Sequence, residues 1–558
     1  MPPIAARLNK ALGTLKLGLP EGLLTSPWLL PLIVWLVFFW QLGGPPLYDL
    51  DEGAFTEATR EMLASGNFIT PYKDGEPRYD KPVMIYWLQA GSVSLLGLNE
   101  FALRLPSAMA ASLWLLALWL FVRQRLDRET ATVAALVMAL SLEIGLIGKA
   151  AVADAVLNLF IALAFFDVYR YRLARLADSP RSRGLLWRVY LWLGLGFLTK
   201  GPVAVFFPLL VSLLFALTMG WREIKVWLGA VFEPRGWLVF LAVAAPWYLA
   251  IYLDNGLGFF QSFFFKHNLG RFGGVIHGHE GFPGYYLAML PLVMLPFSGW
   301  LLAVLPALRR IWADPLDRFL LLWFLCVLAV FSFSSTKLPH YLVYGLTPLF
   351  IMLARHRERL TQSGFNRWLA LLPALIFGLV LLALPLALGP LAEQADKPHE
   401  IALFELGREV LDGFYLLGMV AALVLLVSLF WAHRVALWQR VVLAGVIQTL
   451  VVHGLLVPRV FEVMQAPVKE AALLARQLDE PTVVYKTSMP SFSVYRRAIT
   501  PDRQPEPGDL VFLRIDKLER LQGLYPSEQL ETLFRRGAVA LMRVGEPPAA
   551  AVEVPDHG

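Results

Sequence analysis

The strongest constraint on the fold of this chain is a series of long apolar stretches that recurs along most of its length. About thirteen of them are long enough, or nearly so, to cross a hydrocarbon core of about 30 Å as helices. They cover residues 28–42, 103–122, 130–147, 152–170, 185–199, 201–219, 236–252, 285–307, 317–334, 340–354, 366–389, 413–431 and 437–457. The composition agrees, since 57% of the residues are hydrophobic and only 16% are charged. We therefore expect a polytopic α-helical membrane protein.

Basic residues follow every second apolar stretch, which predicts the orientation of the helices. The arginine and lysine clusters after the second, fourth, sixth, eighth, tenth and twelfth stretches lie at residues 123–128, 170–188, 222–235, 309–318, 355–367 and 434–440. By the positive-inside rule these loops face the cytoplasm, together with the N-terminus. The first stretch is expected to be retained, because no small-residue cleavage pattern follows it. The other loops and the C-terminus are then expected to face outward.

The composition changes after residue 457. Short β-rich runs at Thr482–Tyr485, Leu510–Leu513 and Val539–Val544 alternate with amphipathic helical patterns at Lys469–Leu478 and Ser527–Phe534. We therefore expect a membrane domain over residues 1–457, with outward loops at 43–102 and 253–284, and a small outward α/β domain over residues 458–558.

The first outward loop is unusually rich in ionisable residues. Asp51 and Glu52 precede an amphipathic segment, Phe55–Leu63, and Lys81 stands beside Pro82 before an aromatic run. A helix in the membrane interface would shelter the two carboxylates and make them more basic, as a general base requires. The alternative is that the acidic pair only marks the membrane boundary. Lys81 is either a phosphate ligand or a side chain that reaches the lipid headgroups.

Other outward loops add charged residues at the same face. Lys149 and Asp154 flank a junction between two spans, where an ion pair between them is as plausible as a functional role. Lys200 lies in a very tight turn between two spans. Further along, Lys337, His340 and Tyr341 share the short loop before the tenth span.

The loop from Asp254 to Tyr286 contains two basic residues and several histidines. Lys266 and Arg271 suit the binding of an anion, because guanidinium and ammonium groups bind phosphate. A divalent metal held by some of these side chains is an alternative, although their spacing matches no established ligand pattern. The residues considered for this metal are Asp80, His267, His277, His279 and Glu280.

Together, these loops place carboxylates, cations and aromatic side chains at one membrane face. Such a set suits the transfer of a group from a lipid phosphate to an acceptor, since cations stabilise the charge on the leaving phosphate. A lipid transporter or flippase is an alternative from another class. Transporters, however, place their sites at the midplane between repeats, and this chain shows no repeat.

Five motifs in order carry a resemblance to a known family: YDLDEGAFTEATREML, YDKPVMIYWLQA, LTKGPVAV, HNLGRFGG and STKLPHYL. They resemble the GT-C glycosyltransferases that use polyprenyl-phosphate sugars. They are most similar to the bacterial transferases of 4-amino-4-deoxy-L-arabinose to lipid A, which are related to protein O-mannosyltransferases. The resemblance implies a GT-C fold with about thirteen transmembrane helices and a periplasmic C-terminal α/β domain in the bacterial inner membrane.

The resemblance also implies roles for individual residues. Asp51 takes the place of the catalytic acidic residue, Asp154 resembles the second functional acidic position, and Lys81, Arg271 and Tyr341 look like ligands of the polyprenyl phosphate. The candidate substrate-binding residues are Glu52, Lys81, Lys200, Lys266, Arg271, Lys337 and Tyr341. The chain departs from the family pattern at Gly53-Ala54-Phe55, where a basic or proline residue and a tyrosine are usual.

We accordingly expect an inverting transfer of 4-amino-4-deoxy-L-arabinose from undecaprenyl phosphate to a lipid A phosphate at the periplasmic face. No cofactor is expected to be required, with a divalent metal as the open alternative. The expected partners are the lipid-linked donor, lipid A and membrane lipids, and no nucleic acid. The alternative acceptor is a protein or another glycolipid.

Overall fold

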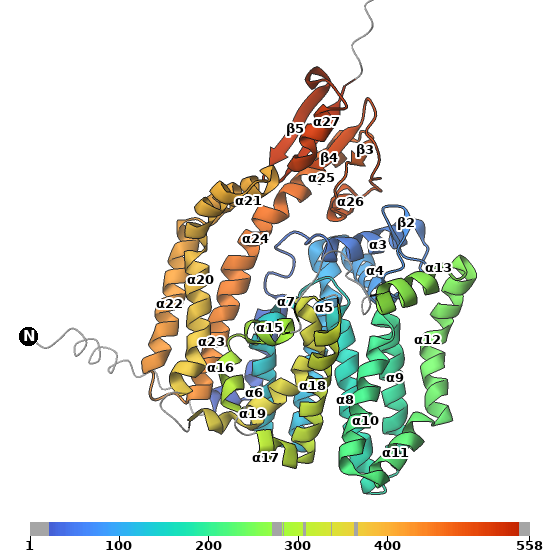
Figure 1. Ribbon diagram of the computed structural model, residues 1–558, viewed down its shortest axis with the longest axis vertical. Helices are drawn as coiled ribbons and strands as arrows, with labels where there is room; N and C mark the ends of the chain where they lie inside the picture. The colour runs from blue at the N-terminus through green and yellow to red at the C-terminus, as the bar shows by residue number, and fades with distance from the viewer. Residues whose placement is uncertain are drawn as a thin grey trace, which may run out of the picture.

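The computed structural model describes residues 22–270, 282, 284–304, 308–335, 337–361 and 366–545, which form a helical bundle beneath a small sheet (Figure 1). The first part of the bundle contains η2 (Pro27–Leu29), α2 (Leu30–Val34), η3 (Trp35–Phe39), α3 (Asp51–Ser65), α4 (Met84–Leu96), α5 (Glu100–Arg125), α6 (Arg128–Leu140), α7 (Leu142–Ile147), α8 (Asp154–Leu176), α9 (Ser182–Lys200), α10 (Val203–Met219), α11 (Trp221–Val231), α12 (Pro234–Asn255), α13 (Gly258–Phe260) and η4 (Gln261–Leu269). A short helix, η1 (Leu23–Thr25), precedes them, and the strands β1 (Tyr72–Lys73) and β2 (Glu76–Pro77) form a hairpin between α3 and α4.

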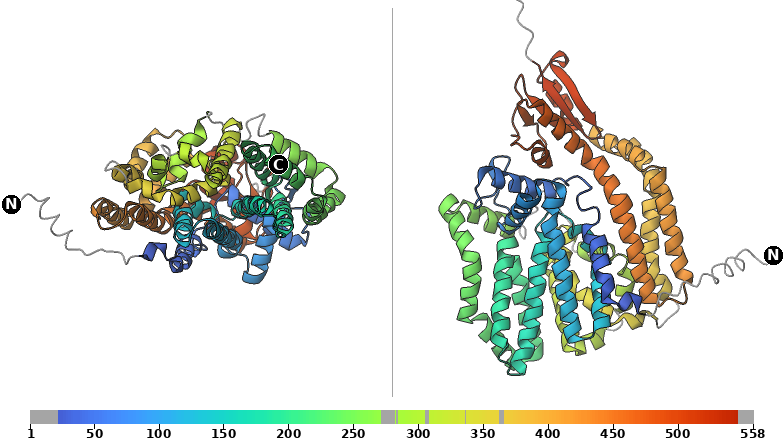
Figure 2. Two further views of the ribbon diagram at one scale, coloured as in Figure 1. Left: turned by 90° about the horizontal axis from the view of Figure 1, so that it is seen from below. Right: turned by 180° about the vertical axis from the view of Figure 1, so that it is seen from behind.

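The second part of the bundle completes the described helices before the sheet. It contains α15 (Tyr285–Val293), α16 (Ser298–Val304), α17 (Leu308–Ala313), α18 (Pro315–Phe333), η6 (Pro339–Gly345), α19 (Leu346–Arg355), η7 (Arg357–Thr361), α20 (Asn366–Gln394), α21 (Pro398–Val410), α22 (Gly413–Trp431), α23 (Leu437–Val451), η8 (Val452–Leu456) and α24 (Val457–Met464). Figure 2 shows that most of these helices run roughly along one direction, as expected of a bundle that crosses a bilayer.

Each predicted span falls on one or more of these helical segments. Over the described residues, six helices are long and apolar enough to cross a membrane, or seven if the bent pair α15 and α16 is one span. The structure thus confirms an apolar helical architecture, and the total of thirteen crossings stays a prediction. The span predicted over 285–307 is not a straight helix, because α15 and α16 meet at an angle of 116°. Pro291 and Pro296 lie at this bend, where their missing N–H groups weaken a continuous helix.

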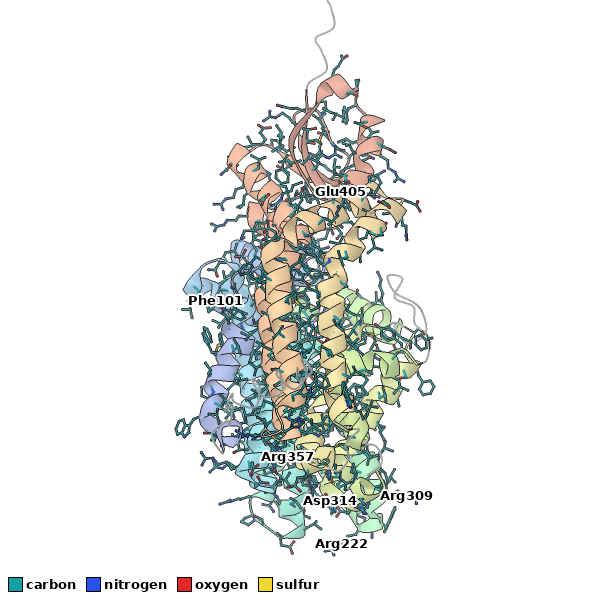
Figure 3. All side chains as sticks on the ribbon, turned by 90° about the vertical axis from the view of Figure 1, so that its left-hand side faces the viewer. Phe101, Arg222, Arg309, Asp314, Arg357 and Glu405 are labelled. Carbon is teal, nitrogen blue, oxygen red and sulfur yellow. The ribbon has the colours of Figure 1, made fainter. Side chains whose placement is uncertain are left out.

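The two ends of the bundle differ in their charged residues. Arg222, Arg309 and Arg357 lie at the end away from the sheet (Figure 3). The loop that contains Asp51 lies at the opposite end, next to the sheet (Figure 1). This separation agrees with the alternation of basic loops that the sequence predicts.

The C-terminal segment contains α25 (Ala466–Leu478), β3 (Thr482–Val484), α26 (Ser491–Arg496), β4 (Leu510–Arg514), η9 (Ile515–Lys517), α27 (Leu518–Gln522), η10 (Ser527–Gln529), β5 (Leu530–Arg536) and β6 (Val539–Val544). The sheet order is β3-β4-β6-β5, with β3 and β4 parallel and the other pairs antiparallel. All three predicted strands are present. The helix predicted at Ser527–Phe534 is wrong: this segment enters β5, which pairs with β6 through a turn at Gly537 (φ 51°). Pairing along β6 therefore overrides the local helical pattern.

The helix predicted at Phe55–Leu63 is confirmed as part of α3, but other helices of the protein cover most of it. Most of α3 is buried, since it packs between α4 on one side and α26 of the C-terminal segment on the other. The main chain of Gly53 allows this approach. A Cβ atom at this position would lie only 2.8 Å from the backbone nitrogen of Ser491. A residue with a side chain at position 53 would therefore force α3 and α26 apart.

Polar contacts fix the C-terminal segment on the first loop. The Asp49 carboxylate accepts hydrogen bonds from the backbone N–H of Ser491 (2.8 Å) and from its hydroxyl (2.5 Å). Asp74 accepts from the Ser493 hydroxyl at 2.7 Å. The Lys469 ammonium pairs with Glu100 at 2.5 Å. The C-terminal segment is therefore attached to the loop that contains Asp51.

A buried ion pair anchors the same loop to the bundle. Glu52, only 3% exposed, accepts hydrogen bonds from Arg104 Nε at 2.8 Å and Nη2 at 2.7 Å. It also accepts from the backbone N–H groups of Tyr48 (2.9 Å) and Ala151 (2.7 Å). Arg104 donates in addition to the carbonyls of Leu42, Pro45 and Pro46. This network ties the first loop to α5 and to the turn before α8.

We expect Glu52→Gln to lower the free energy of unfolding by about 3 kcal/mol, because it leaves the buried Arg104 guanidinium without a counter-charge. Glu400→Gln is the control: Glu400 pairs with the exposed Lys397 at 2.9 Å, and such surface pairs contribute less than about 1 kcal/mol. Unfolding in mixed detergent micelles measures both variants. Equal effects of the two substitutions would contradict an anchoring role for Glu52.

A second expectation concerns pH. Burial raises the pKa of Asp49 from 3.8 to about 7, against the opposing hydrogen bonds from Ser491. Between these values the folded protein holds a proton that the unfolded chain has released, so the free energy of unfolding falls as the pH rises from about 4 to about 7. Asp49→Asn cannot ionise, and we expect its melting temperature to depend less on pH over this window. Asp178→Asn, at an exposed carboxylate, is the control that should retain the wild-type profile.

Candidate active site

A buried carboxylate at the start of α8 is the centre of a polar cluster below the first loop. Asp154 Oδ1 lies 2.7 Å from Lys200 Nζ and 2.8 Å from the hydroxyl of Tyr344, and the Lys200 ammonium is also 2.7 Å from that hydroxyl. The three residues come from α8, α9 and η6. Because α8 and α9 are consecutive antiparallel helices, the start of one meets the end of the other. The tight turn predicted at Lys200 is confirmed, with Gly201 (φ 74°) ending α9.

The structure decides between two partners for Asp154. The local ion pair with Lys149, which the sequence leaves open, is absent: the Lys149 ammonium donates instead to the carbonyl of Trp40 at 2.5 Å. Burial, helped by the charge of Arg104, lowers the pKa of Lys149 to about 7. A partner 46 residues away along the chain thus replaces the one five positions away.

Aromatic side chains surround the Lys200 ammonium. Its nitrogen lies 5.8 Å from the centre of the Tyr341 ring and 5.5 Å from that of Tyr344, within the range of cation–π attraction. Tyr341 is only 6% exposed and packs on Phe331, with ring centres 4.9 Å apart. The structure therefore brings Tyr341, a predicted phosphate ligand, to the Asp154–Lys200 pair.

His340 precedes Tyr341 in η6, and the centres of their two rings are 5.0 Å apart. Its imidazole lies within the electrostatic reach of Asp154, Lys200, Asp51 and Lys81. The sequence placed His340 at this membrane face without assigning it a role, and it did not single out Tyr344. Tyr344 could have been found from its spacing, because residues three apart eclipse on a 3₁₀ helix and Tyr341 is a candidate.

Asp51 is the first residue of α3 and is exposed. Within the described residues its carboxylate has no hydrogen-bond or ion-pair partner. The expected shelter of the carboxylate is wrong for Asp51, and the expected increase in basicity is wrong for Glu52. Asp51 is open to solvent, and in Glu52 burial is outweighed by Arg104, so the pKa of Glu52 is lowered. Asp51 is therefore free to meet a substrate, whereas the carboxylate of Glu52 is fully used in holding the loop.

Lys81 is half-buried at the start of the segment that leads into α4. Its ammonium donates to the carbonyl of Asp80 at 3.0 Å, and the Asp80 carboxylate lies 3.6 Å from Arg78 Nη2. The Arg78 guanidinium covers the ring of Phe55 at 4.7 Å. The charged residues of the motif Arg78-Tyr79-Asp80-Lys81 are thus held against α3, on the side where Asp51 begins that helix.

The remaining candidates are placed less centrally or lie outside the described residues. Lys337 is 6% exposed, and its ammonium donates to the carbonyls of Ser332 and Ser334 at 2.8 Å each, at the end of α18. Lys266 is exposed on η4. Arg271, His277, His279 and Glu280 lie outside the described residues, as does the side chain of His267.

A metal site stays a prediction. Over the residues that the structure describes, no group of three or more histidine, cysteine, aspartate or glutamate side chains could hold a metal ion. Of the candidate ligands, only Asp80 has a described side chain, and it lies beside Arg78. The described residues thus offer a cluster of ammonium groups and carboxylates, which suits a phosphate and a polar acceptor.

A double-mutant cycle tests the pairing of Asp154. We expect Asp154→Asn and Lys200→Met to be coupled by about 1 to 3 kcal/mol in the free energy of unfolding, because each substitution leaves the same buried partner uncompensated. Lys149→Met is the matched control and should add to Asp154→Asn within about 0.5 kcal/mol. Coupling with Lys149 in place of Lys200 would contradict the described cluster.

Comparisons with known proteins agree with this geometry. Residues 80–249 match the family described as dolichyl-phosphate-mannose-protein mannosyltransferase. The chain is 31% identical over 411 residues to the undecaprenyl phosphate-alpha-4-amino-4-deoxy-L-arabinose arabinosyl transferase of Aeromonas salmonicida, covering 71% of this chain and 72% of that one. It is 32% identical over 419 residues to the transferase of the same name from Pectobacterium carotovorum, covering 72% and 71%.

The fold agrees as well. The crystal structure of ArnT from Cupriavidus metallidurans bound to undecaprenyl phosphate superposes with a TM-score of 0.76 at 19% identity, over 93% of this chain and 99% of that one. The predicted resemblance is thereby confirmed for the membrane helices and their arrangement. This chain belongs to the family of the undecaprenyl phosphate-alpha-4-amino-4-deoxy-L-arabinose arabinosyl transferases.

Proposed function

We propose that this protein transfers 4-amino-4-deoxy-L-arabinose from undecaprenyl phosphate to a phosphate group of lipid A at the periplasmic face of the bacterial inner membrane. The observation that carries the proposal is the buried cluster of Asp154, Lys200 and Tyr344 beside Tyr341, at the end of the bundle where the exposed Asp51 begins α3. Membership of the arabinosyl transferase family supports the choice of sugar and of lipid carrier.

In the proposed reaction an oxygen of the acceptor phosphate attacks the anomeric carbon of the sugar. The bond from that carbon to the polyprenyl phosphate oxygen breaks, and undecaprenyl phosphate leaves with the bonding electrons. Attack from the opposite side inverts the configuration. Lysine and arginine side chains stabilise the charge that develops on the leaving phosphate, which is usually the largest contribution to such a catalyst.

Lys81 is proposed to bind the polyprenyl phosphate, together with Tyr341 and Arg271. Lys200 is held at the base of the site by Asp154 and Tyr344, so that Asp154 acts as a positioning residue for that ammonium. The exposed Asp51 is proposed to orient the acceptor or to pair with the ammonium of the amino sugar. A strong base is hardly needed, since a lipid A phosphate is already largely ionised at neutral pH. The proposed reaction requires no cofactor.

We expect Asp51→Asn to lower turnover by at least about a hundredfold while binding of the donor is retained, because the variant keeps the shape of the side chain and removes its charge. Turnover is measured by mass spectrometry of lipid A incubated with the lipid-linked sugar and the purified protein. Asp178→Asn is the control with normal turnover.

Three results would contradict the proposal. Full turnover of Asp51→Asn would remove the catalytic role of this carboxylate. A wild-type protein that adds no pentosamine to lipid A, but glycosylates a protein or another glycolipid, would establish the alternative acceptor. Movement of the donor across liposomes without an acceptor and without transfer would point to a transporter.

A further inference from the structure

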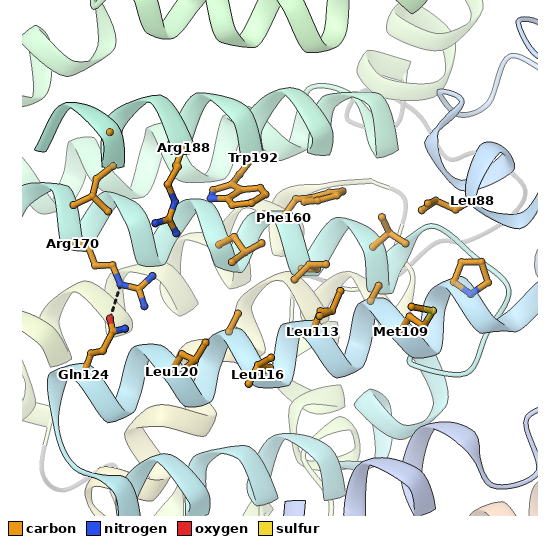
Figure 4. Close-up of a pocket in the computed structure, with 18 of the residues that line it drawn as sticks. Leu88, Met109, Leu113, Leu116, Leu120, Gln124, Phe160, Arg170, Arg188 and Trp192 are labelled. Atoms are coloured by element: carbon orange, nitrogen blue, oxygen red, sulfur yellow. Dashed lines mark hydrogen bonds between the residues drawn. The ribbon is translucent and has the colours of Figure 1, made fainter. Parts of the chain in front are cut away.

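A long groove runs along the bundle, and none of the candidate active-site residues is among its described lining residues. It has a volume of about 1530 Å³ and lies between α4, α5, α8 and α9 (Figure 4). Its outer end reaches Leu88 and Leu95 on α4, and its other end reaches the turn between α8 and α9 at Ser179 and Arg181. The groove therefore extends along much of the length of the helices.

The walls of the groove are apolar along most of this length. From α5, Met109, Leu113, Leu116 and Leu120 point into it (Figure 4), and between 38% and 51% of each of these residues is exposed. Their spacing of three and four residues puts them on one face of α5. Phe160 of α8 faces them from the opposite wall. A polar ligand would leave this apolar surface in contact with water, whereas hydrocarbon chains would remove it from water, which is favourable.

One end of the groove is strongly basic. Its lining includes four arginines and, among the described residues, no aspartate or glutamate; the four are Arg125, Arg170, Arg181 and Arg188. Arg170 and Arg188 share the buried Asp167 carboxylate behind the wall, at 3.1 and 3.0 Å. The guanidinium groups of Arg125 and Arg181 have no hydrogen-bond or ion-pair partner within the described part of the chain. The end of the groove thus carries positive charge that the protein itself does not neutralise.

The position of the basic end indicates which lipids can reach it. It lies at the end of the bundle away from Asp51, where the basic loops predict the cytoplasmic leaflet. That leaflet carries the anionic headgroups, which attract arginine near the surface. From Leu113 to Arg125 the rise along α5 is about 18 Å at 1.5 Å per residue, close to the depth of one leaflet.

We propose that this groove binds an anionic glycerophospholipid of the cytoplasmic leaflet. Its phosphate would lie among Arg125, Arg170, Arg181 and Arg188, and its acyl chains along Leu113, Leu116 and Phe160. The polyprenyl phosphate of the donor is a different ligand, because its phosphate belongs with Lys81 at the other end of the bundle. The bound lipid would join α5 to α8 and α9, which carry Asp154 and Lys200, without touching the reacting groups.

The test is a titration of the full chain in detergent with phosphatidylglycerol, followed by native mass spectrometry, with phosphatidylcholine of the same chains as the neutral probe. We expect phosphatidylglycerol to bind at least tenfold more tightly. Arg125→Gln/Arg181→Gln should weaken its binding by about thirtyfold and leave phosphatidylcholine unchanged, since each arginine contributes about a factor of five. Leu113→Trp should weaken both lipids by filling the groove.

The matched control is Arg175→Gln/Arg183→Gln, which removes two exposed arginines near the same turn that do not line the groove. It should retain tight binding. An equal loss in this control would mean a general attraction between a basic surface and anionic lipid, and would overturn the site. So would an unchanged preference in Arg125→Gln/Arg181→Gln, or undecaprenyl phosphate that displaces phosphatidylglycerol from the groove.

Discussion

The buried pair of Glu52 and Arg104 is the interaction on which the arrangement of the outer end depends. A charged carboxylate and a guanidinium can be buried only when each has its partner and its remaining hydrogen bonds, and here both conditions hold. Arg104 donates hydrogen bonds to the carbonyls of the segment before α3. Glu52 accepts hydrogen bonds from the N–H groups of Tyr48 and Ala151. The first loop, α5 and the start of α8 are consequently fixed to one another, and Asp51 is held at the exposed start of α3.

The second charged cluster has a different form. Asp154, Lys200 and Tyr344 come from three segments, and the side chain of each forms a hydrogen bond with the other two. A lysine held in this way presents its charge at a constant position below the first loop. Binding of the proposed donor phosphate would then need little rearrangement of the site, which would lower the cost of stabilising charge in the transition state. The pair of Glu52 and Arg104 thus fixes the first loop, whereas Asp154 and Tyr344 fix the Lys200 ammonium beneath it.

The C-terminal segment also constrains the position of the first loop and of α3. Asp49 and Asp74 in the first loop bind Ser491 and Ser493 of α26, and Gly53 leaves room for that helix. The absence of a side chain at Gly53 allows a close contact between the backbones of α3 and α26. The charged face of α3 is therefore shaped partly by a segment more than four hundred residues further along the chain.

The sequence by itself determined the class of fold, the apolar helices and the loops that carry the chemistry, because hydrophobic length and flanking charge are local properties. It also identified Asp51, Lys81, Asp154, Lys200 and Tyr341 as candidates of one face. Only the tertiary structure decided the partners: Lys200 in place of Lys149 for Asp154, Arg104 for Glu52, and a strand in place of a helix at Leu530–Arg536. It also added Tyr344 to the site. These outcomes depend on which segments lie side by side in the bundle and the sheet, and neither spacing nor composition along one chain encodes that arrangement directly.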